Sequence, residues 1–429
     1  ALSFESTIAS GPNGTYVAWV DARHGNFEIY VARLGATGWE QLANSADGGG
    51  VSQTGGSSRH PQLAIGADGQ PIVVWTELQG GASHVFVRRW NPSAPNGGQW
   101  IELAGSASGT GLSLTGAADE PRIVQSAAGP VVAWLDRSAG VTNVYARRFN
   151  GAAWEALGTS VSGAGISGAA VNVAGYALAT SGARTAVAWS ETVAGRSQVR
   201  LRELSGGDWI ELAGSAIGEG VSHSTGNAFA PTVAYFEDQL FVAWRDDAPP
   251  DTLGTEIYAV RHEGSTWLPA GVGARSGGGV SASSGGALAP QLTSGGDRLR
   301  LVWIGDQRSA RVGDARAILV RTWNSQQFVE EIAGDAQGDG IRSTALAARE
   351  LATATDMNGR PVVTWFDPSA KRAEILVRGD FQAYGAPGNV FVADGQPGHS
   401  LQSILDANDL SPGDTIVVRG AIPHRSGPR

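Results

Sequence analysis

Acidic residues recur at one fixed place in this sequence and give the first candidates for chemistry. Each lies two or three residues after a tryptophan, in a repeated phrase that reads Val-Ala-Trp-x-Asp in its simplest form. The seven residues are Asp21, Glu77, Asp136, Glu191, Asp246, Asp306 and Asp367. A ring of carboxylates could hold cations or accept hydrogen bonds from sugar hydroxyls. Because a single site needs residues that break a repeat, we interpret these seven as structural, each binding backbone N–H groups of its own turn.

A second recurring charge lies one strand further along each repeat. The arginines are Arg33, Arg89, Arg148, Arg202, Arg261, Arg321 and Arg378. We expect them to pair with the acids above or to stack on aromatic rings, again as a structural feature.

Residues that break the repeat are better candidates for a binding site. Two insertions, "RDDAPPDTLGTE" from Arg245 and "GDQRSARVGDARA" from Gly305, are rich in both signs of charge. With two histidines they form the predicted ligand-binding set: His60, His223, Arg245, Asp246, Asp247, Asp251, Arg308, Arg311 and Asp314. Carboxylates near histidine could do acid–base work, and arginine forks could hold the carboxylate of an acidic sugar or of a peptide.

Several kinds of chemistry have no support in the sequence. It contains no G-x-S-x-G, H-E-x-x-H, P-loop or EF-hand pattern, so we assign no catalytic residue, no metal site and no cofactor. Cysteine is absent, which excludes disulfides and thiolate metal ligands. The net charge of -9 and the lack of a basic run argue against a nucleic-acid partner. No long apolar run predicts a membrane span, and the first residues do not resemble a signal peptide.

The elements that must position these residues follow from a repeat of tryptophan. We call Trp19, Trp75, Trp134, Trp189, Trp244, Trp303 and Trp365 the core tryptophans. They lie 55 to 62 residues apart, a spacing typical of propellers and solenoids. Each repeat carries four strand signals, and the last of them begins at an aromatic residue. These edge aromatics are Trp39, Trp100, Trp154, Trp209, Trp267, Phe328 and Phe381.

Seven repeats of four antiparallel strands predict an all-β protein, a seven-bladed β-propeller over residues 1–387. The predicted blades span about 1–57, 58–118, 119–170, 171–228, 229–287, 288–347 and 348–387. An open solenoid is the alternative, which we rank lower because neither end looks like a polar cap. We expect the core tryptophans to pack each blade against its neighbours.

A glycine-rich motif connects one predicted blade to the next. It reads GGGVS, GTGLS, GAGIS, GEGVS, GGGVS and GDGIR, and its copies begin at Gly48, Gly109, Gly163, Gly218, Gly277 and Gly338. Six connections for seven repeats predict a ring closed by packing, without a strand shared between the two ends. If the strands run outward from the axis, the loops after the second strands and these connections lie on one face, with His60 and His223.

The segment 388–429 differs from the repeats. Ser400 could cap a short helix, and the strand "TIVVRG" follows a turn at residues 411–414. Residues 400–420 resemble the first coil of right-handed parallel β-helix proteins. The alternative, to which we give equal weight, is a C-terminal arm that docks on the propeller.

The repeats resemble those of secreted bacterial seven-bladed propellers, including the tryptophan-repeat lectins, in their "VAW-x-D/E", "IYV-x-R" and "W-x-E-L" phrases. The resemblance implies an extracellular or periplasmic bacterial protein, in some members a sugar binder. From the symmetric scaffold and the lack of a catalytic motif we expect a non-catalytic module that binds glycan or protein through the loop-rich face. Two alternatives stay open: a polysaccharide lyase or hydrolase, and a structural subunit of a surface assembly that docks through residues 388–429.

Overall fold

A computed structural model gives the fold and describes most of the repeat region together with two short tail segments. The described residues are 3–35, 38–247, 254–283, 285–306, 316–331, 336–337, 340–344, 349–356, 361–367, 374–379, 390–393 and 415–418. Within these residues the protein is built almost wholly of antiparallel strands. None of the helices among them is long and apolar enough to cross a membrane.

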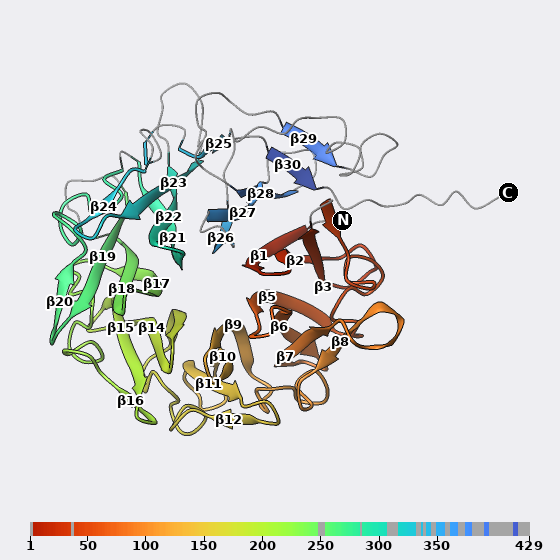
Figure 1. The fold of residues 1–429 in the computed structure, drawn as a ribbon. Coiled ribbons are helices and arrows are strands. Elements are labelled where there is room, and N and C mark those ends of the chain that lie inside the picture. Colours follow the sequence, from red (N-terminus) through yellow and green to blue (C-terminus); the bar gives the residue numbers. More distant parts are fainter. Residues whose placement is uncertain are drawn as a thin grey trace.

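Six blades of the predicted kind follow one another around a central axis, each with its first strand innermost (Figure 1). Blades one to three are β1 (Ser3–Gly11), β2 (Gly14–Asp21), β3 (Glu28–Gly35) and β4 (Gly38–Glu40); β5 (Ser57–Ile65), β6 (Pro71–Gln79), β7 (Ala82–Asn91) and β8 (Gln99–Glu102); β9 (Ala118–Ser126), β10 (Gly129–Asp136), β11 (Asn143–Phe149) and β12 (Trp154–Ala156). A short 3-10 turn, η1 (Pro95–Gly97), precedes β8.

Blades four to six repeat the same order of strands. They are β13 (Val173–Ser181), β14 (Arg184–Val193), β15 (Arg196–Ser205) and β16 (Asp208–Ile210); β17 (Ala228–Phe236), β18 (Gln239–Asp246), β19 (Glu256–Glu263) and β20 (Thr266–Pro269); β21 (Ala287–Gly295), β22 (Arg298–Asp306), β23 (Arg316–Trp323) and β24 (Phe328–Val329). In the sixth, β25 (Arg342–Thr344) also pairs with β23.

The prediction of seven equivalent blades is confirmed for six of them. The seventh sheet differs from the other six in its strands. Its strands are β26 (Arg349–Thr355), β27 (Pro361–Asp367), β28 (Glu374–Gly379), β30 (Thr415–Val418) and β29 (Val390–Ala393), in that spatial order. The fourth strand expected at Phe381 lies outside the described residues. The place beside β28 belongs to β30, which comes from the tail.

The tail strands pair in a way that bears on the two interpretations of residues 388–429. β29 and β30 are parallel, with Val390 opposite Thr415, as successive coils of a β-helix would be. However, β30 lies between β28 and β29, so both of its edges are occupied and no further coil can stack on it. The β-helix resemblance is therefore not confirmed. The helix expected from Ser400 lies outside the described residues.

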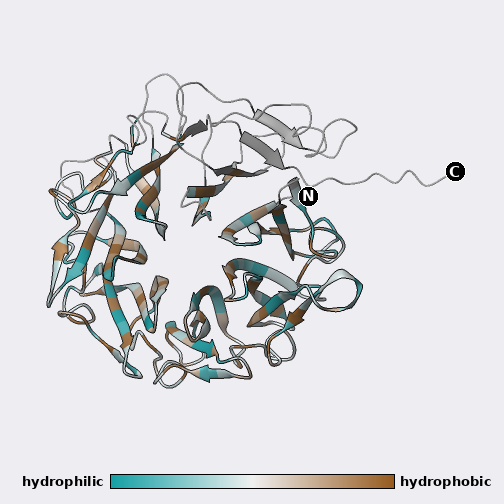
Figure 2. Cartoon of the chain, viewed as in Figure 1, coloured by the Kyte–Doolittle hydropathy of each residue, from teal (hydrophilic) through white to brown (hydrophobic). Residues whose placement is uncertain are grey.

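The core tryptophans pack between neighbouring blades, as predicted. Six of them are at most 2% exposed: Trp75, Trp134, Trp189, Trp244, Trp303 and Trp365. Each packs with apolar side chains of the preceding blade; Trp189 of blade four, for example, shares a core with Val131 and Val144 of blade three. Hydrophobic segments accordingly recur along the strands of every blade (Figure 2).

The edge tryptophans join the same neighbours at the circumference. In four blades the indole N–H donates to a leucine carbonyl of the preceding blade. The pairs are Trp100 to Leu42 (3.3 Å), Trp154 to Leu103 (2.8 Å), Trp209 to Leu157 (2.7 Å) and Trp267 to Leu212 (2.7 Å). Because these carbonyls are held away from water, each bond both stabilises and aligns two blades.

The seventh sheet and blade one meet without a shared strand among the described residues. Ile8 and Val17 of blade one form a small apolar core with Val362 of the seventh sheet, and the Ser6 hydroxyl donates to Thr364 Oγ1 at 3.3 Å. Closure by packing alone agrees with the prediction. Trp19, the core tryptophan of blade one, packs against this core but is only partly buried.

The glycine motif runs as an extra strand-like segment beside the third strand of its own blade. In blade four, Val221 N donates to Val199 O at 2.7 Å, and the Ser222 hydroxyl accepts from Val199 N. A Cβ atom on Gly220 would lie 2.3 Å from Val199 O, and its φ is +63°. The glycine at the third position of the motif is thus required for this close approach and for the left-handed backbone.

We expect Gly220→Ala to lower the free energy of unfolding by about 1–3 kcal/mol more than Gly218→Ala, because the added Cβ displaces the buried Val221–Val199 hydrogen bond. Gly218 is the matched control, since its φ of +54° is similar but no atom lies within 4 Å of the place where its Cβ would stand. Urea unfolding of both variants measures the difference. Equal losses in the two variants would show that the close approach is not limiting.

Candidate functional site

One face of the propeller carries both the loops after the second strands and the connections between blades. The start of each first strand pairs with the end of its second strand, as in Ser3 with Asp21 and Ala228 with Asp246. Both kinds of segment therefore lie at the same end of the blades, as predicted. We call this end the loop face.

Every first strand has an irregularity in its pairing near the loop face. At this point six of the seven strands hold a non-glycine residue with positive φ, close to +50°: Glu5, His60, Glu120, Ala230, Ala289 and Glu350. The fourth blade has Gly175 at its irregularity. Such backbone is costly for residues other than glycine, and it recurs at functional sites when the surrounding fold holds it.

The bulge residues break the symmetry of the ring. In blades five and six they are alanines, whereas the seventh sheet and blades one, two and three carry Glu350, Glu5, His60 and Glu120. We call these four residues, with Arg59 and Asp119, the charged arc. It extends over four neighbouring sheets, and this is the break in symmetry that a single site requires.

Contacts join the members of the arc across the blade interfaces. The backbone N–H of Glu5 donates to Glu350 Oε2 at 2.5 Å, and the backbone N–H of His60 donates to Glu5 Oε2 at 2.7 Å. Each glutamate thus binds the bulge of the next blade, which ties the strained positions to one another.

The imidazole of His60 lies between carboxylates of two different blades. Its Nδ1 is 2.9 Å from Asp119 Oδ1 in blade three, and its Nε2 is 3.6 Å from Glu5 Oε1 in blade one. Burial disfavours the charged ring, but the hydrogen bond to Asp119 and the charges of Glu5, Asp119 and Glu120 outweigh it, so the pKa of His60 is raised. The histidine side chain remains 36% exposed and can be reached from solvent.

Asp119 is held in place before any ligand arrives. Its Oδ1 accepts from the Thr76 hydroxyl at 3.0 Å and from the backbone N–H of Glu120 at 2.8 Å, besides facing His60. Burial opposes ionisation, but these bonds and the charge of His60 hold the pKa of the Asp119 carboxyl below its ordinary value. The carboxylate is therefore charged at neutral pH.

An aromatic pair supports the cationic member of the arc. The guanidinium of Arg59 lies 4.1 Å from the ring centre of Phe27 and 5.4 Å from that of Phe4. The two rings meet edge to face. Arg59 Nη1 is also 3.9 Å from Glu5 Oε1, so the arc contains both signs of charge.

Of the residues predicted from the long insertions, the three that the structure describes, Arg245, Asp246 and Asp247, do not lie around His60. Blade two, with β5, and blade five, with β18, lie on opposite sides of the ring (Figure 1). Arg245 lies over the ring of Phe229, and Asp247 accepts hydrogen bonds from the backbone and side chain of Asn227. Asp251, Arg308, Arg311 and Asp314 lie outside the described residues.

The other two members of the predicted set have local partners. His223 is exposed on the connection between blades four and five, with its Nδ1 3.4 Å from Glu219 Oε2. Asp246 is buried and accepts from the indole of Trp244 at 2.9 Å and from the Ser224 hydroxyl at 2.7 Å. Asp246 thus binds partners on its own strand and on the connection that precedes its blade.

The repeated acids have the structural role that we inferred, although the indole is a partner that we did not foresee. Four of them accept a hydrogen bond from their own core tryptophan: Glu77 (3.0 Å), Asp136 (3.3 Å), Glu191 (3.0 Å) and Asp246 (2.9 Å). Backbone amides bind too, as Ser138 N binds Asp136. In blade six Asp306 comes one position later and pairs with Arg316 instead.

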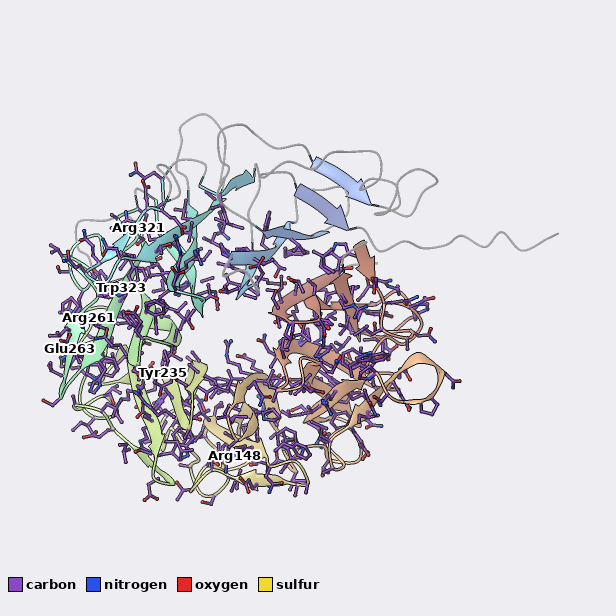
Figure 3. The ribbon with its side chains drawn as sticks, viewed as in Figure 1. Arg148, Tyr235, Arg261, Glu263, Arg321 and Trp323 are labelled. Atoms are coloured by element: carbon purple, nitrogen blue, oxygen red, sulfur yellow. The ribbon has the colours of Figure 1, made fainter. Side chains whose placement is uncertain are left out.

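The expected pairing of these acids with the third-strand arginines is wrong for several blades. Arg33 pairs with Glu40, Arg89 with Asp68 and Arg148 with Glu155, all outside the tryptophan phrase. Arg261 pairs with Glu263, and its guanidinium lies 5.9 Å from the ring centre of Trp323 (Figure 3). Stacking on an aromatic ring, the other expectation, is therefore met by Arg261.

The sequence holds a signal for the arc that the predicted site did not use. In four repeats a proline follows the bulge residue, at Pro61, Pro121, Pro231 and Pro290. Aligning the residue before each proline gives His, Glu, Ala and Ala, which marks blades two and three as different. Glu5, Asp119 and Glu350 are not followed directly by a proline, so this alignment does not identify them. Within the described residues, no group of three or more potential ligand side chains could hold a metal ion.

Comparison with known proteins gives the fold. No family model matches the sequence, and no curated protein matches it. An ulvan lyase of polysaccharide lyase family PL25, solved with -[GlcA(1-4)Rha3S]-, is 12% identical over 87% of this chain and 91% of that chain, with a TM-score of 0.51.

Two further structures are similar at lower scores. An ancestral GH74 enzyme is 17% identical, over 87% of this chain and 47% of that chain, with a TM-score of 0.46. A protein of unknown function from Dyadobacter fermentans is 14% identical, over 75% and 94% of the two chains, with a TM-score of 0.44. At these identities the likeness shows a β-propeller and nothing finer.

We expect the imidazole of His60 to titrate above the ordinary histidine pKa of about 6.5, because the Asp119 and Glu5 carboxylates favour its charged form. Since the raised pKa belongs to the folded state, the stabilisation by His60 is complete below pH ~6.5 and is lost as pH rises through the raised value. NMR titration of the His60 ring measures the pKa. Asp119→Asn should lower it, and an unchanged value would show that Asp119 is not the cause.

Proposed function

We propose that this protein binds a glycan at the loop face, through the charged arc, without transforming it. The observation that carries the proposal is the asymmetry of the bulge residues: four neighbouring sheets present charged side chains where blades five and six present alanine. Charged bulge residues on one part of the ring and alanines on the other give the loop face a single place at which a polar ligand can bind.

The chemistry of the arc suits sugar hydroxyls. Carboxylate oxygens of Glu120 and Glu350, both exposed, accept hydrogen bonds, while Arg59 and protonated His60 donate them. The bonds that fix Asp119 and Glu5 leave little rearrangement to be made on binding, which reduces the entropic cost. Fixed polar groups on a rigid ring are what specific recognition of a polar ligand needs.

The raised pKa of His60 favours a role in binding over a role as a catalytic base. Two flanking carboxylates raise the pKa of His60 and so favour its charged form, which donates hydrogen bonds and cannot accept a proton from a substrate. The ion pairs also keep the ring in one orientation. We therefore propose that His60 is a fixed donor to the ligand.

The setting of the protein is part of the same proposal. We propose that it acts outside the cytoplasm, as the resemblance to secreted propellers implies. We also propose that the seventh sheet serves as the seventh blade of the ring, and that residues 388–429 form an arm attached to it through β30. The fold likeness to a polysaccharide lyase supports only the statement that such a propeller can present a saccharide site.

A glycan array with the wild-type chain, followed by affinity measurements on its best ligand, tests the proposal. We expect His60→Ala and Glu120→Gln each to weaken binding at least about tenfold, because each removes a charged hydrogen-bonding group. His223→Ala is the matched control, being a histidine on the same face but outside the arc. No retained glycan, or equal loss in the control, would contradict the proposal.

A catalytic function is the second candidate, and the contact between His60 and Asp119 is the observation that favours it. An imidazolium backed by a carboxylate can act as a general acid toward a glycosidic oxygen. On this alternative, incubation with acidic polysaccharides should release reducing ends or unsaturated products, and His60→Ala should abolish the release. Intact polysaccharide after long incubation would eliminate the alternative.

A further inference from the structure

A cavity of about 490 Å³ lies between blades one and two, at the circumference and away from the charged arc. Its walls come from the connection after β4 and from β7 and β8. Besides Ser45, the polar residues that line it are Asn44, Gln53, Arg88, Gln99 and Glu102, and Trp100 forms part of the wall. This volume lies in the range of small-molecule sites and is sufficient for one or two sugar rings.

The lining differs from that of the equivalent interface between blades two and three. The repeated Leu-x-x-Ser turn, in which Ser45 and Ser106 bind the leucine N–H, aligns Asn44 with Gly105. The serine that ends the glycine motif aligns Gln53 with Leu114, and the edge tryptophans align Gln99 with Ala153 and Glu102 with Ala156. At the interface between blades one and two, three amides and a carboxylate thus stand where the next interface has residues without hydrogen-bonding side chains. Arg88 is the exception, because it aligns with Arg147 and an arginine is therefore present at both interfaces.

Arg88 is the cation of this cavity. Its Nη1 donates to Val51 O of blade one at 2.7 Å, and no carboxylate forms an ion pair with it among the described residues. Burial lowers the pKa of Arg88, against the opposing charges of Glu102, Glu28 and Glu77. A half-buried guanidinium without a direct counter-ion, facing an open cavity, is suited to a carboxylate ligand.

The remaining polar groups narrow the class of ligand. Asn44, Gln99 and Glu102 are exposed at the cavity, and their oxygens and amide groups can bind hydroxyls. Gln53 donates its amide to Gly50 O, which fixes the side chain. The carboxylate of Glu102 adds a negative charge to the same walls, so it disfavours doubly charged ligands such as phosphate and permits a single carboxylate paired with Arg88.

We propose that this cavity is a second binding site, specific for a sugar acid: a pyranose ring with one carboxylate, which pairs with Arg88 while its hydroxyls bind the three amides and Glu102. The site shares no residue with the charged arc, so it does not depend on the function proposed there. The site is particular to this interface, because the amides occur together here and not at the interface between blades two and three.

Binding of D-glucuronate and D-galacturonate, compared with glucose and galactose by ligand-observed NMR and calorimetry, tests the proposal on the full chain. We expect at least one acid to bind saturably and at least fivefold more tightly than its neutral parent. A hexuronate trisaccharide forms a separate arm: tighter binding of the trisaccharide assigns the ligand to a polysaccharide, and equal affinity assigns it to the free sugar acid.

Variants taken from the chain's own repeat give the matched controls. Asn44→Gly, Gln53→Leu and Gln99→Ala install the residues of the next interface and should abolish binding with the fold intact. Arg88→Gln should remove the preference for the acid, whereas Arg202→Gln should leave it unchanged, since Arg202 makes the same 2.7 Å bond to Ile166 O between blades three and four. His60→Ala should also bind normally.

Three outcomes would overturn the proposal. They are equal affinity for acid and neutral sugar, no saturable binding of any of the four monosaccharides or of the trisaccharide, and equal weakening by Arg88→Gln and Arg202→Gln. The last result would show that the arginine acts only by joining the blades. Thermal melts of each variant verify that a loss of binding is not a loss of fold.

Discussion

The packing of one indole ring per blade against the preceding blade is the interaction on which the rest of the structure depends. Burial of a ring of this size is worth about 4–6 kcal/mol, as an upper estimate. In four blades the indole N–H is also bound, by the acid two residues later on the same strand. In these four blades the repeated phrase therefore does two things: its indole fills the space between the sheets, and its acid satisfies the polar atom that this packing buries. The buried indole nitrogens of Trp303 and Trp365 have no such partner in the part of the chain that the structure describes.

Neighbouring blades are also joined by an arginine that binds a backbone carbonyl of the preceding glycine motif. The arginine is not at the same sequence position in every blade. Arg88 and Arg202 reach from their third strands to a carbonyl of the preceding glycine motif. Blade five has Val260 at that place, and Arg275 from the following connection binds Val221 O instead, at 2.9 Å. With the blades joined in this way, the first strands of blades one and two can hold a positive φ at Glu5 and His60, because glutamates of the neighbouring sheets supply compensating hydrogen bonds.

Prediction succeeded for features that recur in every repeat and did not find the contacts that are made only once, between different repeats. The strands, the core tryptophans and the close approach of the motif glycines all follow from local patterns that recur six or seven times. Glu5, His60 and Asp119 are far apart in the sequence, and only the ring brings both carboxylates within 4 Å of the imidazole. The charged insertions attracted attention for their composition, yet Asp246 and Asp247 bind partners in their own surroundings.

The sequence by itself determined the architecture, because a strand period of two and a tryptophan every 55 to 62 residues leave few ways to bury the rings. The tertiary structure alone decided which strand completes the seventh sheet, since the free edge of β28 is taken by β30 from a distant segment. It also decided the charged arc and the cavity at Arg88. Both are made by contacts between blades, whose register is set by packing and leaves no periodic trace in the chain.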